Sequence, residues 1–236
     1  MTQSPHSILV VEDDDRLAHM MATSLNKAGY EAQVETNGTA AVERIRRDAP
    51  DLVVLDIMLP GADGFTVCKK VREFYNNPIL MVTALGSDDE HIQGLEAGAD
   101  GYLIKPVRLP ILQARVQNLL KRLQPSDSAK EQSIDFGPLH VDPKRRSVTL
   151  GENPIKISTG EFDLLWLLAS HEGIVMSRDD LCRALRGIDY DGIDRSIDMR
   201  VSKLRQKLKN YPEIPIIIKT IHGHGYLFVS PQADAE

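Results

Sequence analysis

The chain has 236 residues, of which 42% are apolar and 26% are charged, and its formal net charge at pH 7 is -6. This length favours two domains, and this composition is typical of globular proteins, which excludes the disordered and low-complexity classes. No apolar run approaches the roughly 20 residues that a membrane helix needs. The N-terminus lacks the pattern of a secretory signal, so we expect a cytoplasmic protein. We interpret Cys68 and Cys182 as buried thiols, because their spacing fits no metal-binding motif.

The first half of the chain alternates apolar runs of strand length with helical patterns. Five runs predict strands, and each is followed by a stretch long enough for a helix. The five runs cover residues 8–11, 32–34, 52–55, 79–82 and 101–104. Strands that are apolar on both faces belong to a parallel sheet covered by helices on both sides. We therefore predict a doubly wound α/β domain, which binds ligands at the carboxyl ends of its strands.

A polar segment separates the two halves. Residues 124–133 contain one small apolar residue, Ala129, among Pro, Ser and charged residues, so this segment cannot bury a face. We predict a first domain over residues 1–123, a linker over 124–133, a second domain over 134–230 and a tail over 231–236.

The second half has a different order of elements. Short strands are expected over residues 139–141, 147–150 and 155–157, followed by helices that begin near Thr159 and Ser177. A third helix carries one apolar stripe, formed by Ile197, Val201, Leu204 and Leu208. Runs 216–221 and 226–229, separated by a Gly-rich turn, predict a β-hairpin. Three helices followed by a hairpin indicate a winged helix.

Charged and hydroxyl side chains follow four of the five predicted strands in the first half. They are Glu12, Asp13 and Asp14 after the first strand, Asp56 at the end of the third, Thr83 after the fourth and Lys105 after the fifth. The carboxyl ends of parallel strands meet at one edge, so these groups should converge. A carboxylate nucleophile, oxygen ligands for Mg²⁺, a hydroxyl and an ammonium together make a phosphoryl-transfer site. Singly, each could be a helix cap or a surface residue, but their joint arrangement favours the site.

This half resembles the receiver domain of bacterial two-component response regulators over residues 7–123. The matching segments are Val10 to Asp14, Leu55 to Gly61 with Asp63 and Gly64, Thr83-Ala84, Gly98 to Asp100, and Lys105-Pro106. The resemblance implies a flavodoxin-like fold in which Asp56 accepts a phosphoryl group from a sensor histidine kinase. It also implies an Mg²⁺ site formed by Glu12, Asp13, Asp56 and the backbone carbonyl of Met58, with Lys105 binding the phosphoryl group.

The same resemblance assigns a switch and a dimer interface. Thr83 and Tyr102 would form the switch pair, because the added phosphoryl charge would draw the hydroxyl inward and open a pocket for the ring. The alternative is that Tyr102 is an ordinary half-buried strand aromatic. The phosphorylated receiver would form a homodimer through its fourth helix, fifth strand and fifth helix. Asp100, Arg115 and Arg122 would supply charged contacts, while Gly101 stands where the family usually has a second acid.

The third helix of the second half is basic. Residues 195–209 contain six Lys and Arg residues and a single acid, Asp198. With the apolar stripe inward, the outward side chains are those of Arg195, Met199, Ser202, Lys203 and Gln206, flanked by Arg200 and Lys207. A solvated cationic helix would show the same pattern, but the neighbouring hairpin favours a recognition helix in the major groove of DNA.

This half resembles the effector domain of the OmpR/PhoB family over about residues 134–229, and looks most like its RstA-type regulators. The matching segments are Thr159 to Phe162 with Leu164 and Leu165, Arg195 to Asp198, Val201 to Leu208, and Ile218 to Tyr226. The resemblance implies double-stranded promoter DNA as a partner, with RNA polymerase as a further one. The candidate DNA contacts are Arg195, Ser196, Arg200, Ser202, Lys203, Arg205, Lys207, Thr220 and His222, the last at a position where relatives usually carry Arg.

The sequence thus predicts a phosphorylation-activated transcriptional regulator rather than an enzyme, with a receiver that assists only its own phosphorylation and dephosphorylation. One alternative is a flavodoxin-like hydrolase or phosphatase with Asp56 as nucleophile, but such an enzyme would need a second Asp where Met58 stands. Another is a regulator that works without phosphorylation. Its acidic pocket would be expected to be incomplete, whereas the pocket here is complete.

Overall fold

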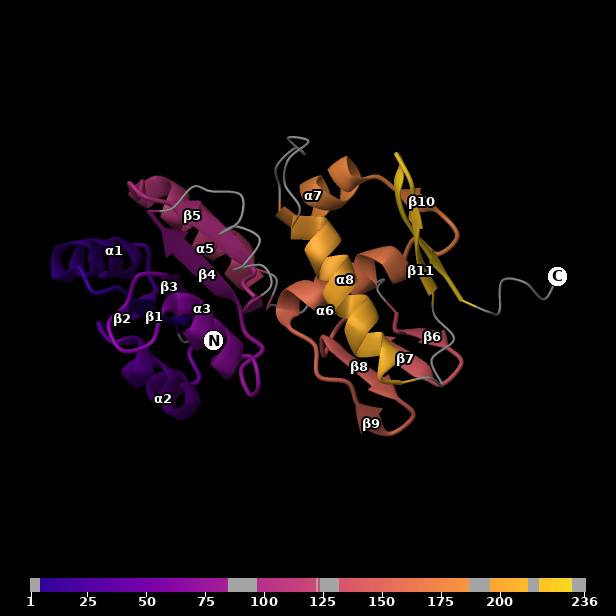
Figure 1. Ribbon diagram of the computed structural model, residues 1–236, viewed down its shortest axis with the longest axis horizontal. Coiled ribbons are helices and arrows are strands. Elements are labelled where there is room, and N and C mark those ends of the chain that lie inside the picture. Colours follow the sequence, from indigo (N-terminus) through magenta and orange to yellow (C-terminus); the bar gives the residue numbers. More distant parts are fainter. Residues whose placement is uncertain are drawn as a thin grey trace. The chain divides into compact units, whose positions relative to one another are not determined.

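The computed structural model describes residues 5–84, 97–121, 123, 132–186, 196–211 and 217–230 (Figure 1). The chain divides into two compact units between Gln124 and Pro125, which is where the predicted linker begins. Most of that linker lies outside the described residues. Among the described residues, no helix is both long enough and apolar enough to cross a membrane.

The first unit contains a parallel sheet, as predicted. Its strands are β1 (Ser7–Val11), β2 (Glu31–Glu35), β3 (Leu52–Asp56), β4 (Ile79–Thr83) and β5 (Gly101–Ile104). They are ordered β2-β1-β3-β4-β5, and every neighbouring pair is parallel. Every residue of β3 and β4 is buried. The strand order reverses beside β1, so the carboxyl ends of β1 and β3 border the crevice where such sheets bind ligands.

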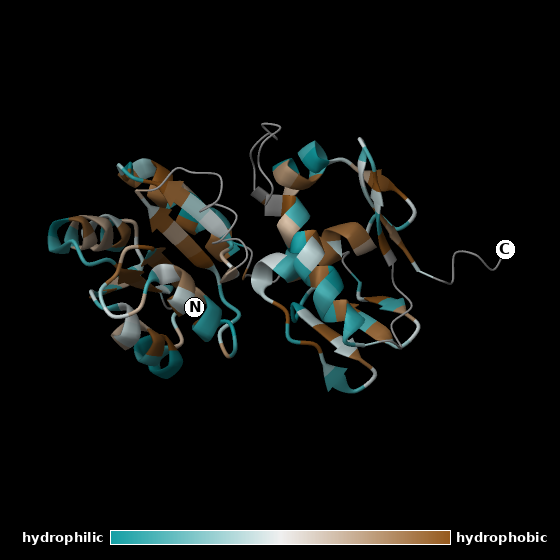
Figure 2. Ribbon diagram, viewed as in Figure 1, coloured by the Kyte–Doolittle hydropathy of each residue, from teal (hydrophilic) through white to brown (hydrophobic). Residues whose placement is uncertain are grey.

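Helices cover this sheet and complete its core. They are α1 (Asp15–Lys27), α2 (Gly38–Asp48), α3 (Gly64–Val71) and α5 (Leu109–Lys121). Met21 of α1 and Leu112 of α5 pack in one cluster with Val10 and Val54 of the sheet. Helices α2 and α3 pack against each other. Figure 2 shows the apolar strands at the centre of the unit and polar residues along its helices.

The second unit has the predicted order of helices and hairpin. Its elements are β6 (Ile134–Phe136), β7 (Leu139–Asp142), β8 (Ser147–Leu150), β9 (Asn153–Pro154), α6 (Thr159–Ala169), β10 (Val175–Met176), α7 (Arg178–Arg186), α8 (Ser196–Lys209), β11 (Ile217–Ile221) and β12 (Gly225–Val229). Strands β6 to β9 form an antiparallel sheet, and a second sheet has the order β10-β12-β11. One core joins the three helices to both sheets. The winged-helix prediction is confirmed.

The expected strand over residues 155–157 is wrong. Those residues form no strand, although Ile155 and Ile157 are both buried. They are apolar because they cover the core of the unit, and the partner of β8 is instead the short segment Asn153–Pro154. The three-residue strand β6 and the two-residue strand β10 were not predicted, because a pattern of two or three residues carries no readable period.

Candidate functional site

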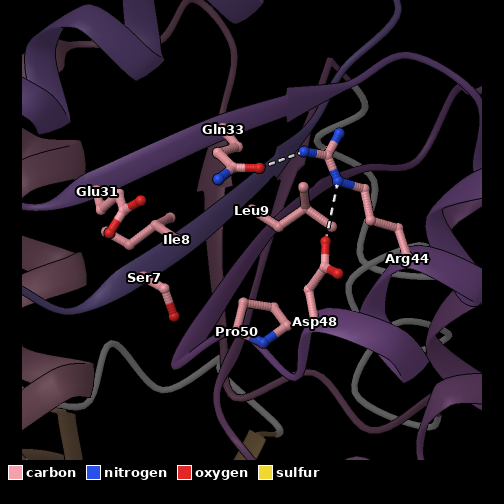
Figure 3. Close-up of a pocket in the computed structure, with 8 residues that line it drawn as sticks. All are labelled: Ser7, Ile8, Leu9, Glu31, Gln33, Arg44, Asp48 and Pro50. Carbon is pink, nitrogen blue, oxygen red and sulfur yellow. Dashed lines mark hydrogen bonds and ion pairs between the residues drawn. The ribbon is translucent and has the colours of Figure 1, made fainter.

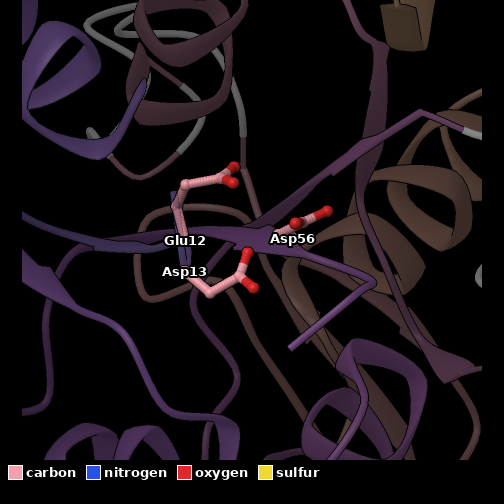
Figure 4. Close-up of side chains that lie close together, drawn as sticks. All are labelled: Glu12, Asp13 and Asp56. Carbon is pink, nitrogen blue, oxygen red and sulfur yellow. The ribbon is translucent and has the colours of Figure 1, made fainter. Parts of the chain in front are cut away.

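Three carboxylates meet at the carboxyl edge of the first sheet, as the sequence predicted. Glu12 directly follows β1 and is 1% exposed, while Asp56 ends β3 and is 3% exposed. One oxygen from each of Glu12, Asp13 and Asp56 lies within 4.8 Å of the others (Figure 4). This convergence follows from the strand order, because β1 and β3 are neighbours in the sheet.

The acidic run after β1 divides between two roles. Asp14 is the N-cap of α1, where its Oδ1 accepts hydrogen bonds from the backbone N–H groups of Arg16 at 2.9 Å and Leu17 at 3.0 Å. Such a cap satisfies donors that the first helical turn leaves without partners. The helix-cap alternative therefore holds for Asp14, whereas Glu12 and Asp13 belong to the carboxylate cluster.

The Lys105 ammonium bridges the two buried carboxylates. It donates to Glu12 Oε1 at 2.8 Å and to Asp56 Oδ2 at 3.0 Å. Burial alone would lower the pKa of Lys105, but hydrogen bonds to Glu12 and Asp56 outweigh it and hold that pKa above its usual value. Burial raises the pKa of Glu12, and its bond to Lys105 offsets only part of this effect. The Asp56 Oδ1 atom accepts from the backbone N–H of Ile57 at 2.7 Å.

The carboxylate cluster fits a divalent cation. Glu12 Oε2 is buried and has no hydrogen-bond partner among the described residues. An acceptor in this situation is costly unless a cation or a donor reaches it. The three carboxylates supply hard oxygen ligands of the kind that Mg²⁺ prefers. Met58 follows Asp56 by two residues, and it is 61% exposed.

Thr83 and Tyr102 lie on adjacent strands and are both buried. Thr83 ends β4, and its backbone carbonyl accepts from the N–H of Lys105 at 2.7 Å. Tyr102 is 7% exposed, and its hydroxyl donates to the Sδ atom of Met81 at 3.1 Å. Burial raises the pKa of Tyr102, so the phenol is neutral at ordinary pH. The ring is thus more deeply buried than the half-buried strand aromatic considered as the alternative.

Asp100 is buried, which contradicts the prediction that its carboxylate makes a charged contact at the dimer surface. Asp100 is 4% exposed and accepts from the Arg72 guanidinium at 2.5 Å and from the backbone N–H of Ile79 at 2.9 Å. Arg72 also donates to the carbonyl of Gly98 at 3.0 Å, so this cluster ties the end of α3 to the segment before β5. Arg115 is half-buried on α5, and Arg122 lies outside the described residues.

Helix α8 presents a polar face, although Arg200 is not part of it. Ser202 and Gln206 are exposed and Lys203 is half-buried. Arg200 is only 5% exposed, so its predicted place beside the outward face is wrong. It lies three residues after Ile197, and this spacing turns it toward the apolar stripe. Arg195 lies outside the described residues, and Ser196 is the first residue of α8.

Two other cations of α8 bond within the domain, and charge counting alone did not anticipate this. Lys207 Nζ donates to Glu161 Oε2 at 2.6 Å. The Arg205 guanidinium donates to the carbonyl of Ile218 at 2.8 and 2.5 Å and to the hydroxyl of Thr220 at 2.8 Å. His222 is exposed in the turn between β11 and β12.

The first unit also has a hollow at the opposite end of its strands. The hollow measures about 160 Å³ and lies between the start of β1, strand β2 and the end of α2 (Figure 3). The Arg44 guanidinium pairs there with Asp48 at 3.4 Å and also donates to Gln33. Because the Arg44 cation already has these partners, the described residues that line this hollow offer no open cation to a phosphoryl group.

Comparisons with known proteins identify a family for each half of the chain. Residues 8–117 match the family model described as response regulator receiver domain, and residues 151–228 match transcriptional regulatory protein, C terminal. The chain is 43% identical over 232 residues to the transcriptional regulatory protein RstA of Escherichia coli K12, covering 94% of this chain and 97% of RstA. It is 38% identical over 222 residues to the sensory transduction protein RegX3 of Mycolicibacterium smegmatis, covering 93% and 97%. The solved structure of DrrB, described as a Thermotoga maritima OmpR/PhoB homolog, is 30% identical with a TM-score of 0.50, covering 96% and 100%.

Proposed function

The chain belongs to the OmpR/PhoB family of two-component response regulators, and from this premise we propose that Asp56 accepts a phosphoryl group from a sensor histidine kinase. The observation that carries the proposal is the Lys105 ammonium held between the buried carboxylates of Glu12 and Asp56. This arrangement supports the proposal, because phosphoryl transfer requires a nucleophilic carboxylate, a cation and oxygen ligands close together.

The reaction needs a nucleophilic carboxylate oxygen and charge neutralisation. An Asp56 oxygen attacks the phosphorus of a phosphohistidine, the P–N bond breaks, and the imidazole leaves as an acyl phosphate forms on Asp56. Glu12, Asp13 and Asp56, with the Met58 carbonyl, would hold Mg²⁺, which neutralises charge on the phosphoryl oxygens. The Lys105 ammonium, already 3.0 Å from Asp56 Oδ2, pairs with a phosphoryl oxygen after transfer. The receiver then assists the later hydrolysis of this acyl phosphate, the one reaction it promotes besides its own phosphorylation.

Phosphorylation then acts through Thr83 and Tyr102. The phosphoryl group brings strong acceptor oxygens to the edge where Thr83 ends β4, and its hydroxyl is a donor for them. Tyr102 lies on the adjacent strand β5, with its ring buried. A shift of Thr83 toward the phosphoryl group stabilises this inward position of the ring. The altered surface of β5 and α5, together with the expected fourth helix, most of which lies outside the described residues, joins two receivers in a homodimer.

The dimer presents two copies of the winged helix to promoter DNA. Ser202, Lys203 and Gln206 of α8 supply polar and cationic groups for the major groove, and His222 extends from the hairpin turn. Arg195 and Ser196 would extend this surface at the start of α8. RNA polymerase is a further partner. We place the protein in the cytoplasm, where a kinase domain, DNA and polymerase are all accessible.

The test is incubation of the full chain with acetyl phosphate and Mg²⁺, followed by intact mass and peptide mapping. One stable phosphoryl group on Asp56, absent from an Asp56→Asn variant, supports the proposal. Rapid turnover of the phosphodonor without accumulation of phosphorylated protein would instead indicate a hydrolase with an aspartyl intermediate. A protein that takes up no phosphoryl group yet binds DNA would be a regulator that works without phosphorylation.

A further inference from the structure

A polar cluster joins α7, α8 and the hairpin of the second unit. Asp198, in the first turn of α8, accepts hydrogen bonds at Oδ1 from the Tyr226 hydroxyl at 2.5 Å and from Arg178 Nε at 2.8 Å. Tyr226 belongs to β12 and is 3% exposed. Arg178 begins α7, and its guanidinium carbon lies 5.1 Å from the centroid of the Tyr226 ring. One carboxylate oxygen therefore connects three elements.

A second attachment lies farther along α8. Arg205 donates through its guanidinium to the backbone carbonyl of Ile218 and to the Thr220 hydroxyl, both on β11. Its guanidinium carbon also lies 5.7 Å from the centroid of the Tyr226 ring. We call Arg178, Asp198, Arg205 and Tyr226 the helix–hairpin junction.

Two attachments constrain a helix more than one does. Asp198 and Arg205 are seven residues apart, which is about 10 Å along a helix axis at 1.5 Å per residue. The first attachment holds the start of α8 against β12, and the second holds its middle against β11. Two fixed points along one axis determine its direction as well as its position, so the junction sets the angle between α8 and the hairpin.

We propose that the helix–hairpin junction determines the sequence specificity of DNA binding without contacting DNA. The inference rests on the proposed function, in which α8 and the hairpin engage the same DNA. Base contacts require side chains in register with base edges, whereas phosphate attraction tolerates small changes of angle. A junction that fixes the angle before binding avoids the entropy cost of ordering α8 and the hairpin at a cognate site. DNA that offers no base contacts does not require a fixed angle, so the junction gives no gain in affinity there.

The competing explanation is that Tyr226, Arg178 or Arg205 touches phosphate directly. A lost phosphate contact weakens binding to all sequences alike, and loss of a charged contact lowers the salt dependence by about one unit. A lost positioning contact weakens binding to the cognate site alone and leaves the salt dependence unchanged. Tyr226→Phe and Arg205→Lys both keep the formal charge of the domain, so general attraction to phosphate is unchanged in them. The ratio of cognate to shuffled affinity then separates the two explanations, because only a lost positioning contact lowers it.

The experiment uses the full chain treated with acetyl phosphate and Mg²⁺. A cognate duplex is first selected with the wild-type protein from a library of random sequences. Fluorescence anisotropy then measures Kd for this duplex and for a shuffled duplex, across a range of salt concentrations. Tyr211→Phe is the matched control, because Tyr211 packs beside the same core without joining the junction.

For Tyr226→Phe we expect the ratio of cognate to shuffled affinity to fall about tenfold, the effect of one hydrogen bond, with an unchanged salt slope. Arg205→Lys should lower the ratio as well, and Tyr211→Phe should not. Equal weakening on both duplexes, or no weakening on either, leaves the ratio of cognate to shuffled affinity unchanged and would overturn the inference. If circular dichroism shows that Tyr226→Phe does not fold, Arg205→Lys decides by the same criteria. A wild-type protein that selects no sequence would overturn the proposed DNA-binding function itself.

Discussion

Replacing Lys105 by Met should destabilise the first unit, because it removes the cation between Glu12 and Asp56. Oxygens of these carboxylates lie within 4.8 Å of each other, and unit charges at that distance repel by about 3.5 kcal/mol at an effective dielectric constant of about 20. Removing one partner from a buried ion pair commonly costs about 3–5 kcal/mol. Since Lys105 itself is 20% exposed, we expect a loss near the lower end, about 3 kcal/mol.

Hydrogen exchange of the β1 and β3 amides, measured in a metal chelator, gives the opening free energy of the first unit. The chain has a single Trp, Trp166 on α6, so Trp fluorescence during urea unfolding reports the second unit. That signal should match the wild type. Added Mg²⁺ should narrow the difference in exchange between variant and wild type, because the ion supplies the missing positive charge and stabilises the folded state by mass action.

Two further variants isolate the electrostatic cause. Asp56→Asn in the Lys105→Met background removes one of the repelling charges, so the double variant should be more stable than Lys105→Met alone. Lys69→Met removes an exposed lysine from α3 and should change stability little. If Lys105→Met in chelator stays within about 0.5 kcal/mol of the wild type, the repulsion argument is refuted.

Three other expectations concern lifetime, assembly and DNA. Met58→Asn should shorten the half-life of the aspartyl phosphate, because an amide two residues after Asp56 can orient a water that the thioether cannot; an equal half-life by radiolabel decay contradicts this. The receiver dimer should depend weakly on salt, since Asp100 is buried and Gly101 has no charge, and sedimentation across salt concentrations measures this. Lys203→Ala should weaken DNA binding and lower the salt slope by about one unit with sequence preference retained, and unchanged affinity would remove Lys203 from the interface.

The sheet and the carboxylate cluster were predictable from the sequence because their signals are local. A strand buried on both faces, such as Leu52–Asp56, reads as one continuous apolar run that ends at its functional residue. The parallel arrangement then brings the ends of neighbouring strands together, whatever the details of side-chain packing. Glu12 and Asp56 thus needed only the strand order to be placed side by side.

The partners of individual cations were not predictable, because they come from distant segments. Arg72 and Asp100 are 28 residues apart, and only the packing of α3 beside the start of β5 joins them. Arg205 was expected to face DNA, but the hairpin supplies it with a carbonyl and a hydroxyl. An apolar stripe on a helix covers about 100°, so periodicity does not fix the side of a residue at its edge, and Arg200 was therefore placed beside the outward face.

The Tyr226 phenol makes the second unit sensitive to alkaline pH. Burial, followed by the hydrogen bond to Asp198, raises the pKa of Tyr226 from its ordinary value of 10 to about 12. Below pH 10 the phenol is protonated in both states, so its contribution to stability is fully present. Between pH 10 and 12 the unfolded phenol ionises while the folded one stays protonated, and stability is lost as pH rises. The expected loss is about 2 kcal/mol by pH 12.

Urea unfolding followed by Trp166 fluorescence at a series of pH values measures this loss in the second unit. Other Tyr and Lys residues also titrate there, so the informative quantity is the difference between the wild type and Tyr226→Phe. This variant lacks the ionisable group and should lose less stability from pH 10 to 12, although it is less stable at neutral pH. Tyr211→Phe should follow the wild type. Parallel curves for the wild type and Tyr226→Phe would show that the Asp198–Tyr226 hydrogen bond does not hold the proton, and that the helix–hairpin junction lacks this contact in solution.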